Sequence, residues 1–313
     1  MKIVFMGTPD FAVPCLRAML SQKHDIAAVV TQPDRAKGRG NKLTPPPVKV
    51  LAEEAGISVY QPERIKTKEF TQTLRDLEPD VMIVVAFGQI LSQEILDIPT
   101  LGCINVHASL LPKYRGAAPI NWCIINGESV TGVTTMYMDK GMDTGDMIIK
   151  KEIAIGENES AGELHDRLMV FGASVLSETM ELLMKRVAPR IPQNNSEATY
   201  APIMNKSLGR IDWSKDAYEI RNLIRGTYPW PGAFSTYNGK VFKIMSAEAC
   251  EFSVKHEKWG RITSVDRDSI VVSCGTGSLR IKELQFENEK RMNVEVYLRG
   301  HEIAEGVTLG NSL

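Results

Sequence analysis

The chain has 313 residues, of which 43% are hydrophobic and 24% charged, and its formal net charge is −1. These values are ordinary for a globular protein and provide apolar material for a sizeable core. The length predicts two domains, with one large domain as the alternative. The near-zero net charge does not by itself point to a polyanionic partner, although a local basic patch is still allowed.

The five cysteines are odd in number and none lies in a CxxC pair, which argues against a disulfide framework and a thiolate zinc site. We interpret them as buried or half-buried thiols in a reducing compartment. The start of the chain has too short an apolar run for a signal peptide, and no stretch approaches the ~18 apolar residues of a membrane span. We therefore expect a cytoplasmic protein.

The first half alternates short apolar runs with segments of helical spacing. Strands are predicted at 3–6, 26–31, 57–60, 81–86 and 102–107, and helices at 11–20 and 48–54. This alternation predicts an α/β fold with a doubly wound, mostly parallel, Rossmann-like sheet. Ligands of such sheets bind beyond the carboxyl ends of the strands.

Two more strands are predicted at 133–138 and 147–155, and Ser160 with Glu163 forms a capping box that opens a helix reaching about Arg186. We expect a first domain over 1–188. Residues 189–208 contain three prolines and have the composition of a linker.

The texture changes beyond residue 209. A helix at 216–225 and the rigid turn Tyr228-Pro229-Trp230-Pro231-Gly232 precede short alternating runs at 233–237, 241–247, 260–265, 269–273 and 278–286. This pattern predicts a second domain over 209–313, a small antiparallel β-barrel (OB-like) or a sandwich.

The turn Gly7-Thr8-Pro9-Asp10 follows the first strand, where a dinucleotide fingerprint would lie. It lacks the second and third glycines, and Pro9 removes an amide donor, which argues against nicotinamide cofactors and a dehydrogenase. The turn could still contact a substrate, or be a plain connection between strand and helix.

A long loop over 32–49 carries five cations against Asp34, four of which are Arg35, Lys37, Arg39 and Lys42. Basic side chains on a glycine-containing loop suit contact with nucleic-acid phosphates. The alternative is a solvated surface loop, and composition does not decide between the two.

Asn105 and His107 share one face of a strand near its carboxyl end. A histidine at such a position is more often structural, but this strand leads into an apolar-then-basic loop, 109–119, that we interpret as a pocket wall. Asp143 lies between two glycines in the loop 139–146, where the alternative is an Asx turn or a cation-binding loop. The carboxylates lack EF-hand spacing, so we expect no metal.

These residues form an ordered set that resembles the folate-dependent formyltransferase superfamily. The set is Asn105-x-His107, Ser109-Leu110-Leu111-Pro112-x-Tyr114-Arg115-Gly116, Gly132-Val133-Thr134 and Asp139-x-Gly141-x-Asp143-Thr144-Gly145. Met6 to Ala12, the basic loop and Tyr228 to Ala233 resemble the branch that acts on methionyl-tRNA. The resemblance covers nearly the whole chain.

The resemblance implies transfer of the formyl group of 10-formyltetrahydrofolate to the free amine of methionyl-initiator tRNA, for translation initiation. Asn105, His107 and Asp143 would be catalytic. Folate, as a co-substrate, would contact Ser109, Leu110, Leu111, Pro112, Phe87, Gln89 and Ile90. Arg35, Lys37, Arg39, Lys42 and the second domain would contact tRNA, and we expect a monomer without metal or membrane.

The chemistry constrains the roles further. The Asn105 amide can donate to the developing oxyanion, typically worth ~3–4 kcal/mol of barrier. His107 can donate to the same oxygen or shuttle its proton, and Asp143 can orient His107 and accept the amine proton through water. The open alternatives are another acceptor (a sugar-nucleotide amine, a purine precursor or water) and a non-catalytic RNA- or nucleotide-binding protein.

Overall fold

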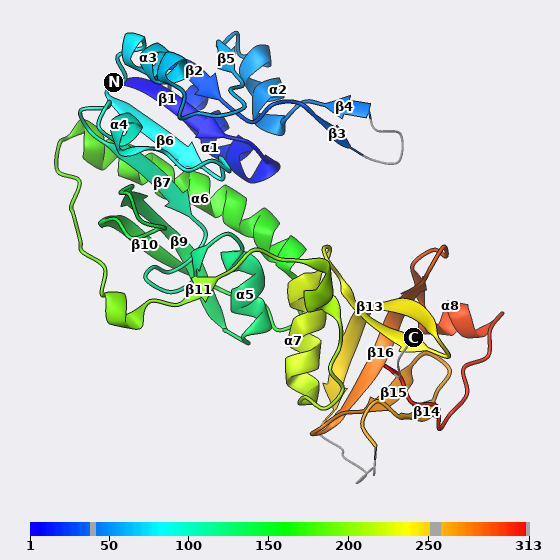
Figure 1. Cartoon of the computed structure of the whole chain (residues 1–313). Coiled ribbons are helices and arrows are strands. Elements are labelled where there is room, and N and C mark those ends of the chain that lie inside the picture. The colour runs from blue at the N-terminus through cyan, green and yellow to red at the C-terminus, as the bar shows by residue number, and fades with distance from the viewer. Residues whose placement is uncertain (38–41, 251–257, 311–313) are drawn as a thin grey trace. The chain divides into compact units, whose positions relative to one another are not determined.

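A computed structural model describes residues 1–37, 42–250 and 258–310 (Figure 1). By its internal contacts the chain divides into two compact units, each made of discontinuous segments. Unit 1 comprises Met1–Pro119, Val130–Ala154 and His165–Ala201, and unit 2 comprises Ile120–Ser129, Ile155–Leu164 and Pro202–Leu313. The domains expected from sequence are contiguous, whereas two short segments from within 1–188 count with unit 2.

Unit 1 is built on a seven-stranded sheet of order β10-β9-β7-β6-β1-β2-β5. The strands from β7 to β5 in this order are parallel, and at the other edge β9 is antiparallel to both of its neighbours, β7 and β10. This confirms the mostly parallel, Rossmann-like sheet. The elements are β1 (Lys2–Gly7), η1 (Asp10–Ala12), α1 (Val13–Ser21), β2 (Asp25–Val30), β3 (Arg35–Lys37), β4 (Lys42–Thr44), α2 (Pro47–Glu54), β5 (Val59–Tyr60), α3 (Lys68–Asp76), β6 (Val81–Val85), α4 (Gln93–Leu96), β7 (Cys103–His107), β8 (Arg115–Gly116), β9 (Val130–Tyr137), β10 (Met147–Ala154), α6 (Ala161–Met184), η2 (Asn195–Glu197) and β11 (Tyr200–Ala201).

Helices cover both faces of this sheet, because successive side chains of a buried strand point to opposite sides. Met82 and Val84 pack in a cluster with Leu74 of α3 and Ile95 of α4. On the α6 side, the hydroxyls of Thr135 and Thr179 lie 2.7 Å apart. The α6 capping box is also present, since the Ser160 amide donates to Glu163 over 2.9 Å and the Glu163 amide donates back to the Ser160 hydroxyl. The first of these hydrogen bonds lowers the pKa of Glu163.

The basic segment expected to be a loop contains a two-stranded ribbon, in which Arg35 pairs with Thr44 and Lys37 with Lys42. The ribbon extends away from the sheet in Figure 1. At its base, Lys49 forms an ion pair with Asp34 over 2.9 Å, and Gln61 donates to the same carboxylate. The short strands escaped the sequence analysis because alternating apolar residues, the usual strand signal, are replaced here by cations.

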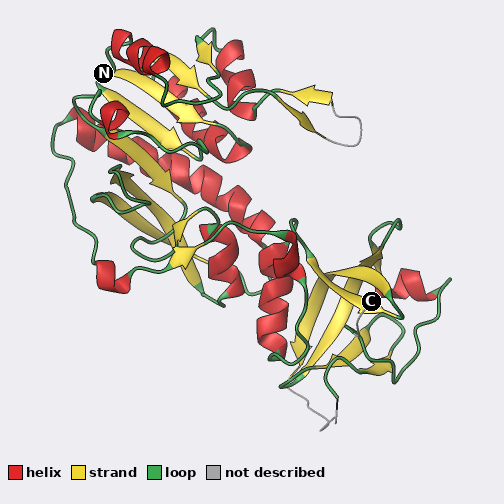
Figure 2. Cartoon of the chain, in the orientation of Figure 1, coloured by secondary structure: helices red, strands yellow, loops and turns green. Residues whose placement is uncertain are grey.

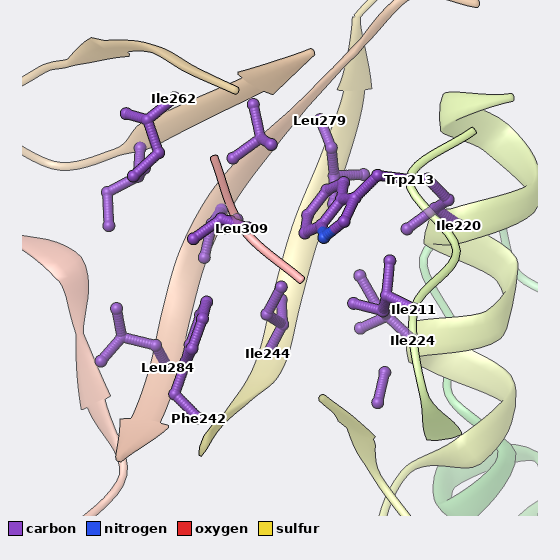
Figure 3. Close-up of a cluster of buried hydrophobic side chains, with 14 of the residues drawn as sticks. Ile211, Trp213, Ile220, Ile224, Phe242, Ile244, Ile262, Leu279, Leu284 and Leu309 are labelled. Atoms are coloured by element: carbon purple, nitrogen blue, oxygen red, sulfur yellow. The ribbon is translucent and has the colours of Figure 1, made fainter. Parts of the chain in front are cut away.

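Unit 2 contains a six-stranded antiparallel sheet of order β12-β13-β16-β15-β14, with β17 beside β16, which agrees with the expected small barrel (Figure 2). Ile220 and Ile224 of α7 pack against this sheet together with Trp213, Phe242 and Ile244 (Figure 3). The elements are α5 (Pro119–Ile125), η3 (Lys206–Gly209), α7 (Ala217–Thr227), β12 (Ala233–Tyr237), β13 (Lys240–Cys250), β14 (Ile262–Val265), β15 (Ile270–Ser273), β16 (Ser278–Phe286), β17 (Met292–Asn293) and α8 (Val294–Leu298).

The five cysteines are all free, and four of them are buried. Burial raises the pKa of Cys15, Cys103 and Cys274 to about 12, so these thiols are unreactive in the folded protein. Among the described helices, none is long and apolar enough to cross a membrane.

Candidate active site

Strand β7 carries Asn105 and His107 to the carboxyl edge of the sheet. Its neighbours fix the register, because Asn105 pairs with Val84 on one side and Met136 on the other, while His107 pairs with Thr134. Val106, which lies between them, is buried and points to the opposite face. The strand thus presents an amide and an imidazole, two residues apart, on one side of the sheet.

His107 is almost enclosed, with 6% of its surface exposed. Its Nε2 lies 3.0 Å from the Tyr114 carbonyl oxygen, and because a carbonyl only accepts, Nε2 carries the proton of this hydrogen bond. The other ring nitrogen, Nδ1, faces the Asp143 carboxylate, with 3.7 Å between Nδ1 and Oδ2. That distance is too long for a hydrogen bond but within reach of ionic attraction.

Asp143 lies in the loop between β9 and β10 and adopts a left-handed backbone conformation, with φ of 54°. Its Oδ2 accepts a hydrogen bond of 2.8 Å from the Gly116 amide, while Oδ1 accepts none within the described chain. Gly145 permits the tight loop, because a Cβ there would lie 1.8 Å from the Tyr137 carbonyl oxygen. The loop therefore holds the carboxylate against His107 and leaves one oxygen available.

Two of the residues around His107 hold an unusual backbone conformation. Tyr114, which supplies the carbonyl to His107, has φ of 61°, similar to that of Asp143. Such conformations typically cost ~1–3 kcal/mol each and persist where the surrounding structure imposes them. Both partners of His107 are therefore placed at an energetic cost.

Asn105 differs from the other two residues because its side-chain amide forms no hydrogen bond to any described residue. It is half-buried and is the middle residue of β7. The amide is therefore free to donate to a ligand, whereas His107 and Asp143 are already held by the protein.

The loop after β7 is held by its own hydrogen bonds. The Ser109 hydroxyl donates to the Lys113 carbonyl over 2.7 Å, and the Thr134 hydroxyl donates to the Ser109 carbonyl over 2.7 Å. Of the expected folate-contacting residues here, Ser109, Leu111 and Pro112 are buried and Leu110 is half-buried. Leu110 is the one of these four residues that is partly exposed.

In the turn after β6, the expected folate-contacting residues likewise divide into those packed or hydrogen-bonded within the protein and one that is exposed. Phe87 belongs to the core, and the Gln89 side chain bonds the Ile65 amide over 2.8 Å and the Pro62 carbonyl over 3.1 Å. Ile90 is 70% exposed. Gly88 is exposed with φ of 84°, so backbone as well as Ile90 is accessible at this turn.

A further set of residues at the site lies in the segment 189–208, which was expected to be a linker. Gln193 contacts the Asp143 loop and Arg115, and the Tyr114 amide donates to the Thr199 hydroxyl over 2.9 Å. Strand β11 then pairs with β8. The one sequence signal for this role is the run of mostly polar residues between Pro192 and Tyr200, whose side chains can form hydrogen bonds that a linker does not need.

The basic residues expected to contact tRNA lie on the β3–β4 ribbon. Arg35, which pairs with Thr44, and Lys42, which pairs with Lys37, are both exposed. Lys37 belongs to β3. Arg39 lies outside the described residues. Within the described part of the chain, no three His, Cys, Asp or Glu side chains come together as a metal site would require.

A hollow of about 560 Å³ lies elsewhere, lined by residues that include Arg75, Asp80 and Thr100. Asp80 and Thr100 precede β6 and β7, so this hollow lies at the amino ends of the strands. It is therefore at the opposite edge from His107 and does not belong to the candidate site.

The mostly parallel, Rossmann-like sheet makes this an α/β protein, with His107 of β7 and Asp143 side by side at the candidate site. A family model described as formyl transferase matches residues 1–180, and another, described as formyl transferase, C-terminal domain, matches residues 203–302. The chain therefore belongs to the formyl transferase family.

Its curated relatives are similar along their whole length. The methionyl-tRNA formyltransferase of Clostridioides difficile (strain 630) is 56% identical over 310 residues, which cover 99% of this chain and 100% of the relative. The protein of the same name from Acetivibrio thermocellus is 53% identical over 310 residues, with the same coverage. Among solved structures, the sugar 3N-formyl transferase WlaRD has a TM-score of 0.70 at 21% identity, covering 93% of this chain and 99% of its own, which shows the shared fold.

Proposed function

We propose that this protein transfers the formyl group of 10-formyltetrahydrofolate to the amine of methionyl-initiator tRNA, giving N-formylmethionyl-tRNA. The observation that carries the proposal is identity of 56% to a methionyl-tRNA formyltransferase over 99% of the chain. The geometry of Asn105, His107 and Asp143 agrees with this chemistry, because acyl transfer needs an oxyanion donor and a proton acceptor.

Asn105 is the proposed oxyanion donor. When the amine attacks the formyl carbon, negative charge develops on the formyl oxygen. The Asn105 amide is half-buried and has no hydrogen-bond partner among the described residues, so it can turn toward that oxygen without breaking a bond. One such donor typically lowers the barrier by ~3–4 kcal/mol.

Asp143 is the proposed acceptor of the amine proton, directly or through one water. Its side chain is 16% exposed, compared with 7% for His107, and its Oδ1 has no partner within the described chain. His107 stands behind it, where a proton on Nδ1 would pair with Oδ2. Its Nε2 donates to the Tyr114 carbonyl, so contact with the formyl oxygen requires His107 to exchange one of these interactions.

The folate co-substrate would bind beyond the carboxyl ends of β6 and β7. Leu110 and Ile90 offer apolar contact, and the accessible backbone at Gly88 offers donors and acceptors for a flat heterocycle. Ser109, Leu111, Pro112, Phe87 and Gln89 would then support the pocket from behind. The WlaRD structure was solved with 5-N-formyl-THF, a folate of the same class.

The tRNA would contact the β3–β4 ribbon through Arg35, Lys37, Arg39 and Lys42, together with the second domain, which we propose spans 209–313 after a catalytic domain at 1–188. That second domain has 15 Lys and Arg against 14 Asp and Glu, a net charge of +1. It cannot attract RNA by overall charge, so the ribbon supplies the concentrated positive charge.

The direct test is to incubate the protein with 10-formyltetrahydrofolate and methionyl-initiator tRNA and to measure formylmethionine released from the tRNA. We expect transfer to this tRNA and little to methionyl-elongator tRNA. A sugar-nucleotide amine serves as the control acceptor. Faster formylation of that amine, or folate binding without transfer to tRNA, would refute the proposal.

A further inference from the structure

We propose that Gln193 is a positioning residue that holds Asp143 in place for the reaction. The inference rests on the proposed function for the role of Asp143, but the geometry that it describes stands by itself. Gln193 lies fifty residues along the chain from Asp143, in a segment that sequence composition assigns to a linker.

The Gln193 carboxamide uses its full hydrogen-bonding capacity. Its Nε2 donates to the carbonyl oxygens of Asp143 and Gly145, each over 2.8 Å. Its Oε1 accepts from Arg115, over 3.1 Å from Nε and 2.7 Å from Nη2. The two N–H groups of the amide donate to two carbonyl oxygens, and its oxygen accepts from two N–H groups of Arg115. These partners fix the orientation of the amide.

Both carbonyls belong to the loop between β9 and β10. Within this loop, the Thr144 hydroxyl and the Gly141 amide donate to the Asp139 carboxylate, and neither hydrogen bond is formed by Asp143 itself. Asp143 itself is in the left-handed region, with φ of 54°, where an L-residue is disfavoured. Gln193 binds the carbonyl oxygen of Asp143 and that of Gly145, two residues later. These two hydrogen bonds oppose relaxation of the left-handed conformation.

Arg115 connects this contact to the other partner of the carboxylate. It is 2% exposed, and its guanidinium meets amide oxygens from Gln193 and Asn195. The next residue, Gly116, donates its amide to Asp143 Oδ2 over 2.8 Å. Gln193 therefore links the backbone of Asp143 to the strand that holds its side chain.

Two variants separate this role from that of a simple hydrogen-bond acceptor for Arg115. Gln193→Met keeps the length of the side chain and removes every hydrogen bond. Gln193→Glu keeps an acceptor for Arg115 but removes both donors and directs a carboxylate at the two carbonyls. Asn194→Ala is the matched control, because Asn194 is adjacent and, among the described residues, its side chain forms hydrogen bonds to Ser196 and Glu197 alone.

The readouts are kcat, the KM values for folate and tRNA, and the NMR shift of the Gly116 amide. Since a misplacement of about 1 Å can cost ~100-fold in rate, we expect kcat to fall by between about 10-fold and 100-fold in both Gln193 variants. Both KM values should stay within about twofold. The Gly116 amide should shift in both variants and remain unmoved in Asn194→Ala.

Wild-type kcat in Gln193→Glu with an unmoved Gly116 amide would overturn the proposal, because Gln193 would then serve only Arg115. Normal kcat per folded molecule in Gln193→Met would overturn it as well. If the wild-type protein formylates no tRNA, the proposed function fails, while the Gly116 shift still decides whether Gln193 holds the carboxylate.

Discussion

At the scale of single residues, the three candidate catalytic side chains are held in different ways. His107 and Asp143 are tied to Tyr114 and Gly116, whereas the Asn105 amide has no partner among the described residues. A group that the protein leaves without a partner contributes little to stability and is available for a ligand. Stability and activity should therefore separate at Asn105 and move together at Asp143.

Asn105→Ala should lower kcat by about 100-fold to 1,000-fold, the usual loss of one oxyanion donor, with unchanged resistance to urea.

Asp143→Ala should lower kcat at least ~100-fold and also cost ~1–3 kcal/mol of stability, because the Gly116 amide loses its acceptor. His107→Ala should likewise lose at least ~100-fold. Formylation rates and urea unfolding measure both quantities, and a near-normal rate in any variant would contradict the role given to that residue.

Strand periodicity placed Asn105 and His107 together, since alternation along β7 is a local property of the sequence. It could not have found Gln193, because the contact with Asp143 depends on where residues 190–201 return after the whole of α6. Nor could it show that Phe87 and Gln89 face the core and the Pro62–Ile65 segment rather than open space.

At the scale of elements, the loop between β9 and β10 depends on close backbone contact. Gly145→Ala would place a methyl group 1.8 Å from the Tyr137 carbonyl oxygen, so the loop must move. We expect a loss of ~1–3 kcal/mol of stability from this overpacking and a fall in kcat of at least ~10-fold. Gly300→Ala is the control, since nothing lies within 4 Å of its added methyl group. Equal kcat and melting temperature in the two variants would show that the loop tolerates displacement.

Elements with strong local patterns were predicted well. Strands β12 and β16 begin and end where the alternating runs do, at Ala233–Tyr237 and Ser278–Phe286. Helix α3 was not predicted, although Thr67 caps it and Leu74 is buried, because Phe70 and Leu74 are the only apolar residues among its nine. The β3–β4 ribbon was missed for the same reason, since it lacks an apolar face to reveal its period.

At the scale of the whole molecule, a net charge of −1 must be reconciled with binding of a polyanion. Surface charge acts over about 8–10 Å at physiological salt, so a local concentration of cations can bind RNA even on a weakly acidic protein. The ribbon provides such a concentration, and its exposed Arg35 and Lys42 form no ion pair among the described residues.

If the ribbon contacts phosphates, its cations should set the salt dependence of tRNA use. Replacing Arg35 and Lys42 by alanine should raise the KM for tRNA and reduce the slope of log KM against log salt by about 1.4 to 1.8, which is ~0.7–0.9 for each lost phosphate contact. The KM for folate should not change. Replacing Lys66 and Lys68, two exposed lysines elsewhere in unit 1, gives a control with the same loss of charge. An equal change of slope in both pairs would mean that net charge, and not the ribbon, attracts the tRNA; a change in folate KM would place the ribbon at the folate site instead.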